Sequence, residues 1–292
     1  MSLRDGRLES QEDDVNKKYQ WLPSEFTVDT NKKVKIGSYI NNLDEIAHKD
    51  LYDSIGQIFE QFIPHFENLL GTNLTGNCQV ITKMSNIIVN KNSQKYDGGV
   101  WHLEGTSYEN IIATGIYYYD VENIKNSNLE FRKAISHPIN YPQNDDYYVE
   151  KKYNINDGDE LNRYLGKIST SVKGRCIVFP NYIQHKVSQF ELNNKNKDGT
   201  RKILVFFLVD PNKKITSTAN VPIHQRHIIK HRLNLMKLNM PDELIECVLD
   251  YMGLMTDDEA QQHMLGLMSA RKYYIDHINE ELFEREFSLC EH

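Results

Sequence analysis

The stretch GRCIVFPNYIQHKV, residues 174–187, decides the fold of this chain. Gly174 favours a turn, CIVF predicts a buried strand, and Pro180 with Asn181 favours a second turn before His185 opens the next strand. Short β-branched and aromatic runs separated by turn residues are typical of antiparallel sheets. This stretch therefore predicts two consecutive strands of a β-rich core.

The same pattern continues on both sides of this stretch, from about residue 77 to residue 211. Further short strands are predicted in CQVITKMSNIIVN, NIIATGIYYYD, LEFRKAI, HKVSQFEL and RKILVFFLVD. Because no helical pattern lies between them, we expect an all-β barrel or jelly roll for this part. Residues 136–166 are polar and rich in Tyr, Asn and Asp, which predicts an insertion between strands.

Helical patterns flank the β-rich region. Apolar residues from Leu51 to Leu70 follow helical spacing, with Pro64 expected to kink the helix and Gly71 to end it. The pattern becomes helical again after about residue 222.

Two helix starts are indicated in this last part. Asn239 is a candidate cap with Pro241 in the first turn, and Thr256 and Glu259 have capping-box spacing. We expect an α+β chain with three parts, namely a mobile tail (1–18), a core with its N-terminal helix (19–221) and a helical appendage packed on that core (222–292).

Composition narrows the possible function classes. The chain has 292 residues and a net charge of −7, which argues against a nucleic-acid partner because phosphate contacts need clustered Lys and Arg. No apolar run approaches the roughly 18 residues of a membrane span, and the N-terminal MSLRDGRLESQEDD has no apolar signal core. We therefore expect a cytoplasmic protein with no membrane partner. Its four widely spaced cysteines are expected to be reduced thiols; they are Cys78, Cys176, Cys247 and Cys290.

The chemistry of the chain is expected at His102 and Glu104, in GGVWHLEG. Two other His-x-acid triplets, HKD at 48–50 and HFE at 65–67, lie at the entry of the predicted helix and inside it. Residues two apart point in opposite directions on a helix but share one face of a strand. Of the three pairs, His102 and Glu104 thus have the geometry to share a metal ion, provided that they lie on a strand.

His185 is the candidate third ligand, from a distant strand. Together with His102 and Glu104 it would form a two-histidine, one-carboxylate facial triad, the arrangement of non-haem Fe(II) oxygenases. The alternative for His185 alone is a hydrogen-bonded histidine of the barrel. The three residues are our candidates for both metal binding and catalysis.

Arg201 opens the next strong strand, TRKILVFFLVDP. An oxygenase that uses 2-oxoglutarate needs a cation deep in the barrel, and a guanidinium can bind a carboxylate through two parallel hydrogen bonds. We expect the polar connection ELNNKNKDGT to let His185 and Arg201 sit on neighbouring strands. The alternatives are an Arg at a strand edge facing water, and Lys202, which has the opposite facing, as the cation.

These motifs resemble those of the double-stranded β-helix Fe(II)/2-oxoglutarate dioxygenases over roughly 77–211. The matching stretches are HLE, GRCIVFPNYIQHKV and TRKILVFFLVD. A longer resemblance, to the family catalogued as domain of unknown function 4246, is carried by WLPSEF, SYINNL, WHLEGTSYENIIATGIYYYD, LEFRKAI and FSLCEH. The resemblance implies a double-stranded β-helix (jelly-roll) core, Fe(II) and 2-oxoglutarate as co-substrate. It departs from the wider superfamily in using Glu104 where Asp is more frequent.

The resemblance also implies a tyrosine that supports the 2-oxoglutarate carboxylate. Tyr118 is our candidate, because it shares parity with Thr114 and Ile116 whereas Tyr117 and Tyr119 face the other way. Trp101 and Gln184 flank the ligands and either line the substrate pocket or pack. A second cluster, of His224, His227 and His231, has no acidic partner between 227 and 231 and is interpreted as a solvated helix face.

The sequence thus predicts an oxygenase that hydroxylates an unidentified substrate with release of succinate and CO2. The substrate would be a small molecule or an amino-acid or protein side chain. Two rivals remain, a cupin-like metal enzyme without 2-oxoglutarate and a non-catalytic binding module on the same fold. The sequence leaves the oligomeric state open.

Overall fold

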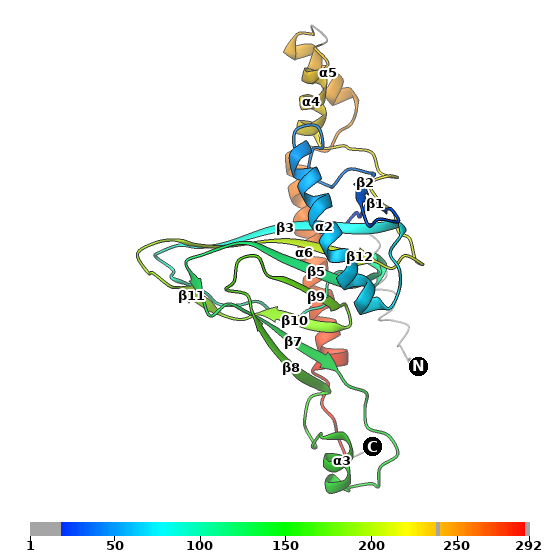
Figure 1. The fold of residues 1–292 in the computed structure, drawn as a ribbon, viewed down its shortest axis with the longest axis vertical. Helices are drawn as coiled ribbons and strands as arrows, with labels where there is room; N and C mark the ends of the chain where they lie inside the picture. Colours follow the sequence, from blue (N-terminus) through cyan, green and yellow to red (C-terminus); the bar gives the residue numbers. More distant parts are fainter. Residues whose placement is uncertain (1–18, 238–239, 290–292) are drawn as a thin grey trace.

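The computed structural model describes residues 19–237 and 240–289 (Figure 1). The strands are β1 (Ser24–Val28), β2 (Val34–Ile36), β3 (Gly76–Val89), β4 (Lys95–Tyr96), β5 (Ile111–Glu122), β6 (Ile124–Lys125), β7 (Asn128–Ala134), β8 (Asn162–Ser169), β9 (Cys176–Pro180), β10 (Ile183–Val187), β11 (Phe190–Leu192) and β12 (Gly199–Val209). The helices are α2 (Lys49–Leu70), the 3-10 turn η1 (Ser107–Glu109), α3 (Asp146–Tyr153), α4 (Arg226–Leu235), α5 (Asp242–Tyr251), α6 (Asp257–Ile278) and the π-helical turn η2 (Asn279–Phe283). The expected α+β class is confirmed.

Three antiparallel sheets organise the strands. The largest has the order β2-β1-β3-β12-β5-β9, a second has the order β10-β7-β8, and a third has the order β4-β11-β6. The chain crosses repeatedly between the first two sheets, since β5, β9 and β12 belong to the large one and β7, β8 and β10 to the smaller one. The two sheets enclose a common apolar core.

β12 is the strand on which both cores depend. Its even-numbered residues Leu204, Phe206 and Leu208 pack toward α2, and its odd-numbered residues Val205, Phe207 and Val209 pack into the core between the sheets. A strand that is buried on both faces needs a continuous apolar run instead of an alternating one. This requirement explains why ILVFFLV, residues 203–209, is uninterrupted.

Aromatic rings join α2 to the outer face of the large sheet. Phe59 and Phe62 of α2 meet Phe206 edge-on, at centroid distances of 5.1 and 5.5 Å, and Phe59 also meets Phe26 at 5.0 Å. α2 continues through Pro64 and ends at Gly71, whose left-handed φ of 64° lets its N–H donate to the Glu67 carbonyl. The predicted helix and its end are confirmed.

The predicted insertion is wrong at its C-terminal boundary. Residues 162–166 belong to β8, which pairs with β7 along its whole length. Most of β8 is exposed on both faces, so its sequence NRYLGKIS has no apolar period from which a strand could be predicted. The rest of the segment contains α3.

The C-terminal part is helical as predicted. α4 and α5 extend from one end of the molecule, and α6 runs from there along the sheets toward the end that carries α3 (Figure 1). Thr256 and Glu259 form the expected capping box of α6, and Pro241 is the N-cap of α5 instead of lying in its first turn. The expected cap Asn239 and the tail 1–18 lie outside the described residues, and the three-part division stays a prediction.

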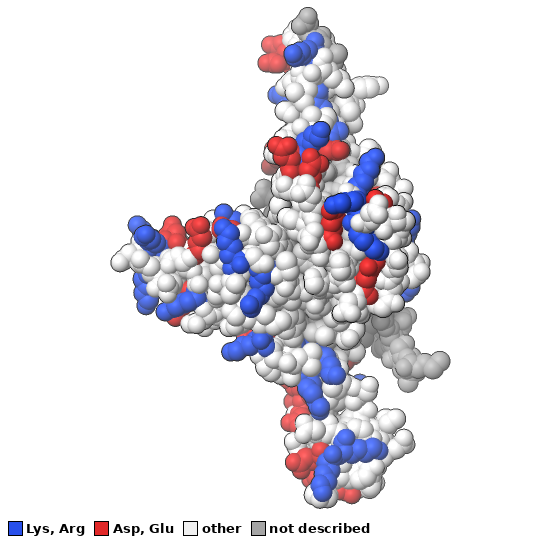
Figure 2. All heavy atoms as spheres, viewed as in Figure 1, with Lys and Arg blue, Asp and Glu red and all other residues white. Residues whose placement is uncertain are grey.

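Charged side chains of both signs lie on the surface. On the face shown in Figure 2, acidic and basic side chains are interspersed and do not gather in one large patch of a single sign. Within the described residues, no helix is both long enough and apolar enough to cross a bilayer.

Two glycines of the α2 interface should respond in opposite directions to the same substitution. A Cβ on Gly115 of β5 would lie 2.7 Å from a ring carbon of Phe62, whereas a Cβ on Gly56 of α2 would meet only the Val34 carbonyl at 3.8 Å. We expect Gly115→Ala to lower the free energy of unfolding by about 1–3 kcal/mol through overpacking. Gly56→Ala should raise it by up to about 1 kcal/mol through helix propensity. Denaturant unfolding of both variants is the measurement, and equal effects would contradict this packing.

Candidate metal centre

His102, Glu104 and His185 converge in the structure. One ligand atom from each lies within 4.8 Å of the other two, and within the described residues no other group of His, Cys, Asp and Glu does the same. The Glu104 Oε1 atom lies 3.2 Å from His185 Nε2 and 3.7 Å from His102 Nε2. Within the described residues His224, His227 and His231 do not form such a group: His227 and His231 are exposed on the helix at 226–235, and His224 lies just before it.

Backbone pairing brings the first two residues to the third. The His102 N–H donates to the His185 carbonyl and the His185 N–H to the His102 carbonyl, both at 3.1 Å, and the Gly99 N–H donates to the Val187 carbonyl at 2.9 Å. This is an isolated bridge, and Glu104 lies in a bend. The expectation that His102 and Glu104 share a face of one strand is therefore wrong, because the chain turns between the bridge and the carboxylate.

Asn181 fixes that bend. Its side chain accepts a hydrogen bond from the Glu104 N–H at 3.0 Å and donates to the Glu104 carbonyl at 2.9 Å and to the Ile111 carbonyl at 3.1 Å. The sequence identified Asn181 only as a turn residue after β9. Its position directly after Pro180, four residues before His185, was the one available signal.

The orientation of the His102 ring suits a metal ligand. Its Nδ1 atom lies 2.8 Å from the Val100 carbonyl, which can only accept, so Nδ1 carries the proton. Nε2 then points toward Glu104 and is the atom that would bind a metal ion. A second hydrogen bond of this kind orients ligating histidines in metal sites generally.

The charges of the three groups are coupled. Burial raises the pKa of Glu104, but the hydrogen bonds and charges of His102 and His185 outweigh this effect and hold its pKa well below the usual range. Burial lowers the pKa of His102, but its hydrogen bond to Glu104, the charge of that carboxylate and its hydrogen bond to the Val100 carbonyl together outweigh this effect and raise the pKa. Burial, reinforced by the nearby His102, lowers the pKa of His185. Glu104 is thus held as an anion and His185 as a neutral imidazole, the states that a cation requires, whereas His102 would have to release the proton that Glu104 favours.

A buried glutamate anchors the loop that follows the site. Glu109 is fully buried, and its carboxylate accepts hydrogen bonds from the backbone N–H groups of Trp21 and Thr106, each at 2.7 Å. Arg271 of α6 forms an ion pair with the same carboxylate. Sequence reasoning missed Glu109, because an acidic residue in a polar loop is normally exposed.

Arg201 and Tyr118 form a second buried polar group. Arg201 is 2 % exposed and Tyr118 is fully buried, and the Arg201 Nη2 atom donates to the Tyr118 hydroxyl at 3.1 Å. Lys202 faces the other way and pairs with Asp120 at 3.0 Å, as its parity predicted. Arg201 and His185 do not lie on neighbouring strands: β12 sits between β3 and β5, whereas β10 pairs with β7 in the smaller sheet. Between β10 and β12 the chain forms β11, which belongs to the third sheet.

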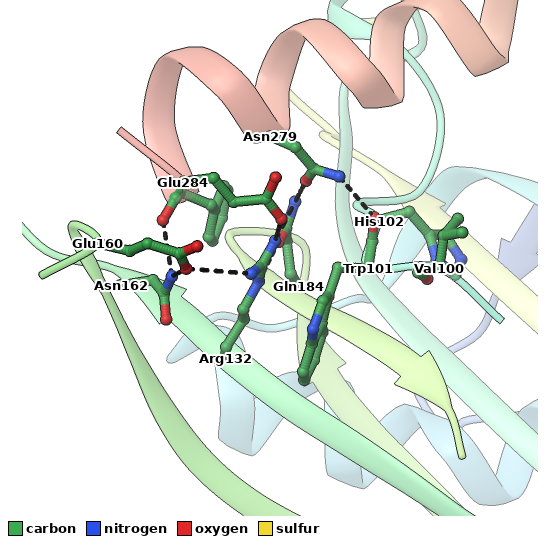
Figure 3. Close-up of polar contacts among 10 residues, drawn as sticks. Val100, Trp101, His102, Arg132, Glu160, Asn162, Gln184, Asn279 and Glu284 are labelled. Atoms are coloured by element: carbon green, nitrogen blue, oxygen red, sulfur yellow. Dashed lines mark hydrogen bonds and ion pairs between the residues drawn. The ribbon is translucent and has the colours of Figure 1, made fainter. Parts of the chain in front are cut away.

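Trp101 and Gln184 pack in a polar network (Figure 3). Gln184 is fully buried and its Oε1 atom accepts a hydrogen bond from Arg132 Nε at 2.7 Å. The Trp101 ring lies under Arg132, 4.9 Å from the guanidinium carbon. Of the two alternatives for these residues, packing is what their contacts show.

The three candidate ligands differ in their exposure to solvent. The His102 side chain is 26 % exposed, against 9 % for Glu104 and 5 % for His185. A separate groove of about 560 Å³ lies between the N-terminal segment, β3 and α6, and its lining includes Trp21, Lys83 and Leu267.

Comparison with known proteins places the chain in a family. The family model described as "Protein of unknown function (DUF4246)" matches residues 2–78 and 73–232. The chain belongs to this family. No curated protein matches it.

Three solved structures resemble this DUF4246 chain remotely. They are "Selenomethionine labeled Fe(II)/(alpha)ketoglutarate-dependent dioxygenase TqaL" (12% identity, 73% of this chain and 80% of that chain, TM-score 0.40), IDO from Bacillus thuringiensis (10%, 72% and 86%, 0.39) and a bsmA homolog from Methylobium petroleophilum PM1 (7%, 66% and 64%, 0.36). The function proposed below rests on the site geometry and not on these likenesses.

Replacement of Asn181 should weaken the site without removing a ligand. Asn181→Ala frees the backbone of Glu104, so we expect the affinity for a divalent metal to fall by about 10–100-fold, the usual effect of losing an outer-shell partner. Asn181→Asp keeps an acceptor for the Glu104 N–H but cannot donate to either carbonyl, and should fall in between. Titration with Co(II) measures the affinity. Wild-type affinity in Asn181→Ala would show that the bend is held by other contacts.

Proposed function

We propose that this protein is an Fe(II)/2-oxoglutarate-dependent dioxygenase with a double-stranded β-helix core. The observation that carries the proposal is the convergence of His102, Glu104 and His185 within 4.8 Å at a site that opens on one side. The crossing of the chain between two facing antiparallel sheets supports the β-helix core. Hydroxylation of a small molecule, or of an amino-acid or protein side chain, is the proposed outcome, with release of succinate and CO2.

The donor set fits Fe(II). Two imidazoles and one carboxylate leave coordination positions open, and this combination is typical of non-haem Fe(II) oxygenases. When bound, the iron would supply the activation of dioxygen. The protein's part is to keep Glu104 ionised through His102 and His185, to fix the Glu104 backbone through Asn181, and to orient the His102 ring through the Val100 carbonyl.

Arg201 fits the distal carboxylate of 2-oxoglutarate. Among the described residues no carboxylate lies within ion-pair distance of its guanidinium, and its Nε atom has no hydrogen-bond partner. A buried cation without a partner is costly, so a carboxylate that binds there gains a strong charge-assisted contact. The Tyr118 hydroxyl accepts from Arg201, and its own proton, for which the Thr170 side chain is a partner in this structure, would be donated to a carboxylate bound there.

Tyr118 remains a hydrogen-bond donor at neutral pH. Burial raises the pKa of its hydroxyl, and the nearby Arg201 offsets only part of this increase. The phenol therefore stays protonated. Arg201 would offer the N–H groups of Nε and Nη to an anion, and Tyr118 would offer its hydroxyl.

The exposed side of the site is where substrate would approach. His102 is the most accessible of the three ligands, while His185 is shielded by the Phe179 ring, whose centroid lies 4.8 Å from that of the imidazole. Apolar side chains between the sheets exclude water from the other side. The protein thus protects one face of the site and leaves the other face for the molecule to be oxidised.

Removal of one ligand should abolish iron binding while the fold survives. We expect His185→Ala to lower the affinity for Fe(II) by more than about 100-fold, beyond the effect of losing an outer-shell contact. His65→Ala, on the exposed face of α2, is the matched control and should bind iron as the wild type does. Iron content after anaerobic loading and the melting temperature are the measurements. Full iron occupancy in His185→Ala would exclude His185 as a ligand.

Arg201→Ala should raise the requirement for 2-oxoglutarate and leave iron binding nearly intact. Loss of one partner of a buried charge pair costs about 2–5 kcal/mol, so half-saturation should rise at least about 30-fold. Lys202→Ala, one residue along on the outer face, is the control and should leave the curve unchanged. Succinate formation is measured against 2-oxoglutarate concentration. An unchanged curve for Arg201→Ala would favour a cupin-like metal enzyme without 2-oxoglutarate.

A further inference from the structure

The residues that directly precede the two histidines bind one and the same side chain. Asn279, the first residue of η2, donates from Nδ2 to the Trp101 carbonyl at 3.3 Å. Its Oδ1 atom accepts a hydrogen bond from Gln184 Nε2 at 2.6 Å. A carboxamide from the end of α6 therefore joins the His102 segment to the His185 strand (Figure 3).

The neighbours of Asn279 fix which way its amide points. Arg132 can only donate, so the Gln184 oxygen faces its Nε atom, at 2.7 Å. The Gln184 NH2 group must then face Asn279, where only the oxygen can accept. The NH2 group of Asn279 is left for the Trp101 carbonyl.

The backbone of Asn279 is also fixed, by a hydrogen bond within η2. The Glu284 N–H donates to the Asn279 carbonyl at 2.7 Å, across the π-helical turn. The Glu284 carboxylate binds Arg132 Nη2 at 2.7 Å, and the Phe283 ring lies 5.4 Å from the same guanidinium. π-helical turns are rare and occur frequently at functional sites. Here the turn places one amide between two segments that carry candidate ligands.

This contact lies on the reverse side of the site. Successive side chains of an extended segment point to opposite faces, so Gln184 points away from the face that carries the His185 imidazole. His102 and His185 form an antiparallel bridge, so the residues that precede them, Trp101 and Gln184, lie in opposite directions along the paired segments. Asn279 thus spans the bridge diagonally and resists rotation of one segment against the other.

We propose that Asn279 is a positioning residue of the metal centre, which fixes the relative placement of the His102 and His185 imidazoles from behind. The inference rests on the proposed metal site. It gives the C-terminal helix a part in metal binding, although that helix contributes no ligand. The rings that it positions have centroids only 4.3 Å apart, so a small rotation changes the ligand spacing appreciably.

A purely structural role is the alternative, in which Asn279 only fastens the C-terminal segment to the sheets. Glu284→Gln provides the comparison, because it weakens the same attachment at Arg132 and leaves the contacts to Trp101 and Gln184 in place. Asn279→Leu keeps the branched outline of the side chain and removes its hydrogen bonds to Trp101, Gln184 and Arg132. Asn279→Asp keeps the acceptor for Gln184 and loses the donor to Trp101.

The experiment titrates the full-length variants with Co(II), and with Fe(II) under anaerobic conditions, and records their melting temperatures. The Co(II) absorption spectrum reports the ligand geometry independently of turnover. We expect Asn279→Leu to lower metal affinity by about 10–100-fold and to change that spectrum, with Asn279→Asp in between. Glu284→Gln should lower the melting temperature comparably while metal affinity and spectrum stay close to wild type.

The outcomes separate this inference from the proposed function. If the wild type binds metal and Asn279→Leu binds it with the same affinity and spectrum, the positioning role is wrong while the metal site stands. If Glu284→Gln lowers the metal affinity as much as Asn279→Leu does, the loss of affinity comes from a weaker attachment of the C-terminal segment in general. That result would also overturn the specific role of Asn279. If the wild type binds neither Fe(II) nor Co(II), the metal site and the inference fall together.

Discussion

The candidate metal centre depends on the two backbone hydrogen bonds that join His102 to His185. They require the segment before His102 to lie directly against β10, and Gly98 permits this approach. Its φ is 100°, and a Cβ there would lie 3.2 Å from both the Val187 carbonyl oxygen and the Gln189 nitrogen. A larger residue would push the segment away from β10. The position of one candidate ligand is therefore determined by a glycine four residues earlier.

Among the described residues, the buried charged side chains have charged or titratable partners, with the exception of Arg201. Arg132 pairs with Glu284, Glu109 with Arg271, and Asp44 with Arg232, and in each pair at least one partner is almost fully buried. Burying an ion costs far more than exposing it, and a partner is what makes such burial tolerable. Arg201 is buried as deeply, yet among the described residues it has no acidic partner. This difference from the other buried ions is what supports the proposed anionic ligand at Arg201.

The sequence predicts those features that depend on local pattern. The run ILVFFLV predicts β12 because both of its faces are buried, and the apolar spacing of α2 predicts that helix together with its end at Gly71. The candidate ligands could be selected because few residue types suit a metal. Asn181, Glu109 and Asn279 could not be found, because each acts through contacts with residues distant in the sequence. No periodicity marks a buried glutamate whose partners are Trp21 and Arg271, and β8 was missed because its exposed sequence lacks an apolar period.

The contacts of α6 and η2 show that the C-terminal part belongs to the site physically, although the family match ends at residue 232. Arg271 neutralises the buried Glu109 behind the Glu104 loop, and Glu284 neutralises the buried Arg132 behind β10. Without these partners two ions of opposite sign would be left uncompensated inside the core, each next to a segment that carries a candidate ligand. The Glu104 loop follows directly on His102, which pairs with His185 of β10. Loss of the partner of either Glu109 or Arg132 would therefore be expected to displace both histidines. The helix that supplies no ligand thus stabilises the two charges on which the placement of the ligands depends.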